Sequence, residues 1–186
     1  MEVQFAGFGG QGIVLAGYLL GKALAVYEGK NASMTQSYGP EARGGACSSG
    51  VVISPDPQQI VDYPKVTRPD VLVVMSQEAL TTYLPRLKPG GTLIYDADLV
   101  SPQDLPEGIT AYAVPATRIA ETEIGKRIVA NVVMLGALVV LTGVVSQEAM
   151  AEAIRTTVKP DYVELNLKAL EVGMAYAKGL LQPQEV

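Results

Sequence analysis

Short β-branched runs alternate with segments of helical spacing along most of this chain, and this alternation most constrains its fold. Residues 71–75 read Val-Leu-Val-Val-Met, which is the pattern of a strand covered on both faces. Further strands are predicted at 3–6, 50–53, 92–95 and 110–114, and helices at 12–27, at 77–87 and from Ala116 onward. The alternation predicts an α/β fold: one three-layer α/β/α domain over residues 1–186, with a largely parallel or mixed sheet.

The last third of the chain is expected to be helical. Residues 128–145 are almost wholly apolar, but a spanning helix needs about 20 apolar residues, so we expect a helix buried in a core or a subunit interface. Asn131 is the polar residue near the start of that helix, and we expect its amide to bond a neighbouring loop. Ser146 is predicted to cap the next helix, and the spacing over 163–181 predicts one long amphipathic helix.

Residues 31–49 are polar and rich in glycine, serine and tyrosine, with Pro40 among them. This composition predicts a long loop that contains some extended pieces.

Composition excludes several classes of function. The net charge of −5 argues against a nucleic-acid-binding domain, which needs a basic face to neutralise phosphates. Histidine is absent, and Cys47 is the only cysteine, so neither an internal disulfide nor a cysteine-ligated iron–sulfur cluster held by this chain alone is expected. No metal ligands are therefore predicted. A single unpaired cysteine and an N-terminus unlike a signal peptide favour the cytoplasm.

A glycine-rich turn lies where the first predicted strand meets the first predicted helix. Residues 7–12 match the spacing G-x-G-x-x-G, which lets the backbone turn sharply and lets another group approach closely. The helix that follows offers unpaired N–H groups to an anion. The candidate binding residues of this turn are Gly7, Gly9, Gly10, Gln11 and Gly12.

The same turn has other interpretations. A dinucleotide-binding fold also places an acid about 20 residues further on, at the end of the second strand, to hold the ribose. Here Glu28 falls inside or just after the helix, and residues 31–37 contain no acid. The ribose-binding half of the pattern is therefore missing, and strand–helix packing or a subunit contact explains the glycines as well as anion binding does.

A second glycine-rich segment, residues 37–45, reads Ser-Tyr-Gly-Pro-Glu-Ala-Arg-Gly-Gly. Its only cation is Arg43, whose guanidinium suits a phosphate or a carboxylate, although pairing with Glu41 or with an acid of another subunit is an equal alternative. Tyr38, Arg43, Gly44 and Gly45 are its candidate binding residues.

Together these two motifs resemble the gamma subunit of 2-oxoacid:ferredoxin oxidoreductases, of the 2-oxoglutarate or branched-chain type, which is related to domain III of pyruvate:ferredoxin oxidoreductase. The joint occurrence of both motifs at this separation is specific, whereas either alone is weak. The resemblance covers nearly the whole chain, through residues 70–75, 87–91, 95–96, 115–117, 130–131, 135–137 and 166–170. Ala42 departs from it, because a larger residue, often methionine, is expected there.

This resemblance implies a part in the CoA-dependent oxidative decarboxylation of a 2-oxoacid such as 2-oxoglutarate to its acyl-CoA, with electrons passed to ferredoxin. It implies that thiamine diphosphate and iron–sulfur clusters lie on alpha and beta partner subunits, and it allows a ferredoxin-like delta subunit. The chain alone is then expected to bind no cofactor, to carry no catalytic residue and to be inactive. An apolar interface at residues 132–145 would favour a homodimer of the isolated chain.

The main hypothesis is that the two glycine-rich segments help to hold CoA at the entrance of an active site whose reactive groups lie on partner chains. One alternative is a non-catalytic assembly module whose glycine loops contact the alpha and beta subunits. The other is a stand-alone dinucleotide-binding oxidoreductase, against which the missing ribose acid argues.

Overall fold

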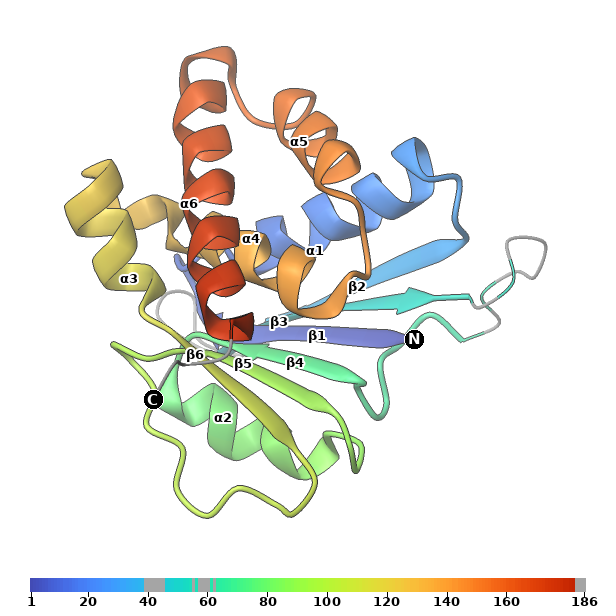
Figure 1. The fold of residues 1–186 in the computed structure, drawn as a ribbon. Helices are drawn as coiled ribbons and strands as arrows, with labels where there is room; N and C mark the ends of the chain where they lie inside the picture. The colour runs from blue at the N-terminus through green and yellow to red at the C-terminus, as the bar shows by residue number, and fades with distance from the viewer. Residues whose placement is uncertain (39–45, 55, 57–60, 62, 183–186) are drawn as a thin grey trace.

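A mixed sheet forms the middle layer of the protein, as seen in a computed structural model that describes residues 1–38, 46–54, 56, 61 and 63–182 (Figure 1). Its strands are β1 (Glu2–Phe8), β2 (Ala32–Tyr38), β3 (Ala46–Ile53), β4 (Val71–Val74), β5 (Thr92–Asp96) and β6 (Thr110–Val114). Their order is β2-β3-β1-β4-β5-β6. Strands β1, β4, β5 and β6 run parallel, whereas β3 is antiparallel to both β1 and β2.

The predicted extended pieces within residues 31–49 are confirmed, but they are longer than a loop would hold, because β2 and the start of β3 account for most of the segment. The side chains of β2 are half-buried or exposed, so this edge strand lacks the apolar alternation that marks a half-buried strand. In β3, Ser49 is buried directly beneath Gly17 of the first helix, where a Cβ would collide with the serine Oγ. Close packing of helix and sheet therefore selects small residues here, and their polarity conceals the strand.

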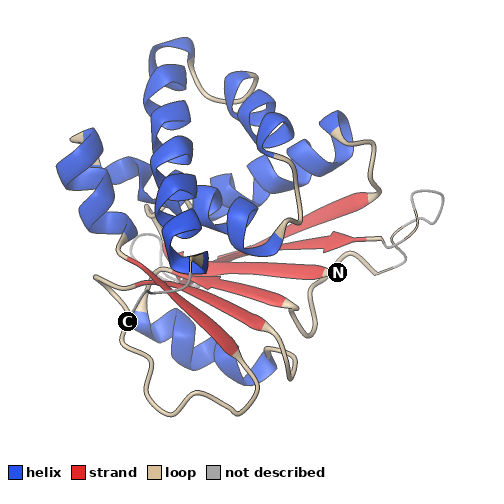
Figure 2. Cartoon of the chain, in the orientation of Figure 1, coloured by secondary structure: helices blue, strands red, loops and turns tan. Residues whose placement is uncertain are grey.

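Helices cover both faces of the sheet, as Figures 1 and 2 show. One face carries α1 (Ile13–Lys22), α3 (Ala116–Ile119), α4 (Ala130–Thr142), α5 (Gln147–Arg155) and α6 (Val163–Leu181), and the other carries α2 (Gln77–Tyr83). The larger core cluster lies on the first face, and a smaller one, with Leu72, Val74 and Leu80, lies beneath α2. These layers confirm the predicted α/β/α fold, its mixed sheet and its helical C-terminal third.

The apolar segment forms the centre of the helical layer. Every residue of α4 from Ala130 to Val139 is buried, and α6 packs so closely against it that a Cβ at Gly173 would collide with the Val133 carbonyl oxygen. A buried α4 confirms the core-helix prediction, and residues 130–139 are covered within the chain itself. Among the described residues, no helix is long and apolar enough to cross a membrane.

The C-terminal helices begin as the sequence predicts. The Ser146 Oγ accepts a hydrogen bond from the Ala149 N–H at 3.2 Å, which confirms the predicted cap of α5. Helix α6 runs unbroken from Val163 to Leu181, which confirms the long amphipathic helix.

Candidate functional site

The glycine-rich turn joins the carboxyl end of β1 to the amino end of α1. Gly10 and Gly12 have φ angles of 97° and 73°, a left-handed region that side chains disfavour. A Cβ at Gly10 would meet nothing within 4 Å, whereas one at Gly12 would collide with the side chain of Asn131. Gly9 and Gly10 are exposed, so the backbone of this part of the turn is open to a ligand or another chain.

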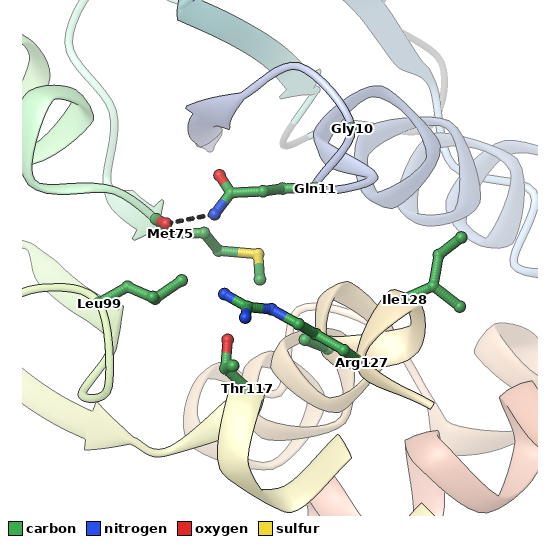
Figure 3. Close-up of a pocket in the computed structure, with 8 residues that line it drawn as sticks. Gly10, Gln11, Met75, Leu99, Thr117, Arg127 and Ile128 are labelled. Atoms are coloured by element: carbon green, nitrogen blue, oxygen red, sulfur yellow. Dashed lines mark hydrogen bonds between the residues drawn. The ribbon is translucent and has the colours of Figure 1, made fainter. Parts of the chain in front are cut away.

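Gln11 holds the turn in place. Its side-chain Oε1 accepts a hydrogen bond from the Phe8 N–H at 2.6 Å, and its Nε2 donates one to the Met75 carbonyl oxygen at 2.7 Å (Figure 3). The amide therefore ties the end of β1 to the end of β4. Gly7 serves the same packing, because a Cβ there would collide with the Gln11 side chain and lie 2.9 Å from Ile13 Cδ1.

Asn131, at the start of α4, fastens the other side of the turn. Its Nδ2 donates a hydrogen bond to the Gly12 carbonyl oxygen at 3.1 Å, which confirms the predicted bond between this buried amide and a neighbouring loop. The turn is thus held by amide side chains from two sides, and Gly12 has no room for a side chain of its own.

Beside the turn lies a cavity of about 270 Å³ at the carboxyl ends of β1, β4 and β5, which we call the turn pocket. It is lined by Gly10, Gln11, Met75, Leu99, Thr117, Arg127, Ile128 and Ala130. Figure 3 shows the Arg127 side chain reaching across the pocket toward Thr117 and Leu99, whereas Ile128 points away. In parallel α/β sheets this edge is where ligands commonly bind.

Arg127 supplies a cation that the sequence analysis did not single out. Its Nη1 lies 3.4 Å from Glu121 Oε1, and both side chains are largely exposed. Exposed pairs of this kind contribute little, so the guanidinium is available to a phosphate or carboxylate entering the pocket. Nothing in the local sequence marks Arg127, because it shares a cavity with Gly10 only once the chain has folded and the 3-10 turn Arg127–Val129 lies next to the glycine-rich turn.

A buried carboxylate behind the pocket holds Thr117, one of the residues that line it. Asp96, at the end of β5, is fully buried and accepts hydrogen bonds from the Thr117 hydroxyl at 2.6 Å, the Thr117 N–H at 3.1 Å and the Asp98 N–H at 3.1 Å. Burial raises the pKa of the Asp96 carboxyl despite these bonds. The group therefore positions Thr117 at the pocket wall.

The second motif begins at the same edge of the sheet. Tyr38, the exposed last residue of β2, is paired with Cys47 of β3, which is in turn paired with Gly7 of β1. The described start of the motif, Ser37 and Tyr38, therefore lies in register with the turn, about two strand spacings, or roughly 10 Å, away. Arg43, Gly44 and Gly45 lie outside the described residues.

Cys47 behaves as a small buried hydrophobe. The side chain is buried within the larger core cluster, and this burial raises the pKa of its thiol. A thiol in such surroundings is a poor nucleophile.

The geometry weakens the dinucleotide interpretation. Glu28, the acid nearest the expected spacing, forms an ion pair with Lys30 at 2.7 Å and accepts a hydrogen bond from the Ser146 N–H at 2.6 Å. Burial opposes ionisation of Glu28, but these partners lower its pKa overall. The carboxylate is therefore engaged beyond the far end of α1. The strand that follows α1 in a dinucleotide-binding fold pairs in parallel with β1, but here the strand beside β1 on the β2 side of the sheet is β3, which is antiparallel.

Comparison with known proteins gives consistent relationships. The family described as pyruvate ferredoxin/flavodoxin oxidoreductase matches residues 2–176. A 2-oxoglutarate synthase subunit KorC from Methanocaldococcus jannaschii is 52% identical over 180 residues, which are 96% of this chain and 95% of that protein.

Two solved structures are also similar. One is the gamma subunit of keto/oxoacid ferredoxin oxidoreductase from Geobacter sulfurreducens, with 44% identity, a TM-score of 0.83 and coverage of 96% of this chain and 98% of that one. The other is the 2-oxoglutarate:ferredoxin oxidoreductase from Magnetococcus marinus with 2-oxoglutarate, coenzyme A and succinyl-CoA bound. That similarity has 27% identity and a TM-score of 0.87, and covers all of this chain but 32% of the other.

Proposed function

Because this chain belongs to the pyruvate ferredoxin/flavodoxin oxidoreductase family and is a gamma subunit of a multi-subunit 2-oxoacid:ferredoxin oxidoreductase, we propose that the enzyme it serves acts on 2-oxoglutarate. The relative from Methanocaldococcus jannaschii, named as a 2-oxoglutarate synthase subunit, supports this choice of substrate, since it is similar over nearly its whole length. The Magnetococcus marinus enzyme, solved with 2-oxoglutarate and succinyl-CoA, supports it independently.

The proposed division of labour places the reactive groups on partner chains. Thiamine diphosphate supplies the decarboxylation chemistry and iron–sulfur clusters carry electrons to ferredoxin, both on alpha and beta subunits, with a ferredoxin-like delta subunit as a further partner. The residues of this chain do not fit a cluster, which needs several cysteines, because Cys47 is the only one and is buried. A reduced buried thiol is consistent with a cytoplasmic enzyme.

This chain's own part in the proposal is to hold CoA. The observation that carries it is the turn pocket, whose lining combines the Arg127 guanidinium with the open backbone of Gly10. CoA carries several phosphate charges, and an arginine on a chain of net charge −5 gives a localised site for them. Tyr38, whose strand ends at the same edge, and Arg43 with Gly44 and Gly45 are proposed to complete the receptor.

The test is steady-state kinetics of the assembled enzyme with Arg127→Ala. A charge-assisted contact to phosphate predicts a KM for CoA that rises about tenfold or more, with the KM for 2-oxoglutarate unchanged. Arg118→Ala is the matched control, because Arg118 is an equally exposed arginine on α3 that pairs with Asp98 and does not line the turn pocket.

Unchanged CoA kinetics in Arg127→Ala would remove the pocket from the reaction and favour the assembly-module alternative. Calorimetry separates the two functions directly. CoA should bind the complex more tightly with this chain present than with it omitted, whereas a module that serves assembly alone predicts equal affinity in both preparations.

A further inference from the structure

A second cavity lies next to the turn pocket, on the other side of the segment Ile128–Asn131. It has a volume of about 360 Å³, and Ile128 contributes to both cavities. We call it the asparagine groove, after the two residues, Asn131 and Asn166, that line it from α4 and α6. Its size lies within the range of small-molecule sites.

The two asparagines present acceptors that nothing in the described part of the chain uses. Asn131 is 2% exposed and Asn166 is 6% exposed. The Asn131 Nδ2 donates a hydrogen bond to the Gly12 carbonyl oxygen at 3.1 Å, and the Asn166 Nδ2 donates one to the Tyr162 carbonyl oxygen at 2.8 Å. A carbonyl can only accept, so the orientation of each amide is determined. Both Oδ1 atoms then remain without a donor among residues 1–38, 46–54, 56, 61 and 63–182.

The remaining walls favour a flat ring beside a negative charge. Leu15 and Val158 are half-buried apolar walls, and the Tyr162 ring is 52% exposed at the rim. Lys159 also lines the groove and forms no ion pair within the described ranges. Apolar walls and an aromatic face suit a heteroaromatic ring, amide oxygens left open to the groove suit its N–H donors, and the lysine suits a phosphate.

We propose that the asparagine groove holds the adenine of CoA. The amide oxygens of Asn131 and Asn166 accept from the 6-amino group, Tyr162 stacks on the base, and Lys159 meets the 3′-phosphate. This inference rests on the proposed CoA function, in which Arg127 of the adjoining turn pocket receives the pyrophosphate. An apolar side chain from a partner subunit fits less well, because it would bury both amide oxygens without a donor, which is costly.

The test is calorimetry on the assembled complex with three ligands: CoA, 4′-phosphopantetheine, which lacks the nucleoside, and deamino-CoA, in which the 6-amino group is an oxygen. Tyr162→Ala should weaken CoA binding about tenfold, as removal of a stacking ring does, and leave 4′-phosphopantetheine unaffected. The wild-type complex should bind deamino-CoA several-fold more weakly than CoA. Tyr18→Ala is the matched control, because Tyr18 is an exposed tyrosine on α1 that does not line the groove.

Each outcome separates the inference from the function beneath it. If Arg127→Ala weakens CoA binding while Tyr162→Ala leaves it unchanged, this chain binds CoA but the base lies elsewhere, and the inference fails alone. If neither variant alters CoA binding, both the inference and the proposed function fail. Equal weakening of CoA and 4′-phosphopantetheine by Tyr162→Ala would also overturn the inference, since the ring would then act on something other than the nucleoside.

Discussion

Replacing Gly12 with alanine tests how the glycine-rich turn is built. The new Cβ would lie 2.7 Å from Asn131 Cγ, and the residue would have to keep a φ of 73°. The left-handed backbone costs about 1 kcal/mol, overpacking against the buried amide about 2 kcal/mol, and loss of the Asn131 hydrogen bond about 1 kcal/mol. We therefore expect the free energy of unfolding to fall by about 4 kcal/mol.

Gly143→Ala is the matched control for backbone strain. Gly143 ends α4 with a φ of 61°, and a Cβ there would meet nothing within 4 Å, so only the conformational cost of about 1 kcal/mol should appear. Urea unfolding followed by far-ultraviolet circular dichroism measures both variants, with unchanged m values. The double variant Gly12→Ala with Asn131→Ala should recover part of the loss, because the collision is gone. A Gly12→Ala variant no less stable than Gly143→Ala would refute the reasoning.

Three further predictions concern the core and its charges. Gly173→Ala should lower the free energy of unfolding by about 3 kcal/mol, because the new Cβ would collide with the backbone of α4. Gly179→Ala, on the same helix, has open space and should raise that free energy by about 0.5 kcal/mol through helix propensity. Urea unfolding of the two variants measures the difference. Asp96→Asn should lower the free energy of unfolding by about 1–3 kcal/mol near neutral pH, since an NH2 group would replace a carboxylate oxygen that accepts from N–H donors. Because the pKa of Asp96 is raised in the folded protein, the free energy of unfolding of the wild type should fall as pH rises from 3.8 through the folded pKa. Asp96→Asn should weaken this dependence when the free energy of unfolding is measured against pH. Burial acts to raise the pKa of Asp70, but Lys88, 2.7 Å away, helps to lower it overall. The stability that the Asp70 carboxylate contributes is therefore lost as pH falls below 3.8. Lys88→Met should make the loss of stability with acid less steep over that range.

Local patterns in the chain were enough to predict most of the layered fold. The β-branched run of β4 and the spacing of apolar residues along α6 report burial of one segment on one or two faces, and each segment carries that information itself. The Ser146 cap is equally local, because donor and acceptor lie three residues apart. The glycine motif likewise identified the turn at the end of β1 before any contact was known.

Contacts between distant segments decided the rest. Strand β2 has little apolar patterning, because it lies at an edge and is held by backbone pairing with β3, which any side chain allows. Arg127 enters the turn pocket, and Asn131 reaches Gly12, only because α4 and the 3-10 turn before it lie beside the glycine-rich turn that precedes α1. The cation and the unpaired amide oxygens proposed to bind CoA are thus assembled by the tertiary fold, since burial and proximity between residues far apart in sequence leave no periodic trace in the chain.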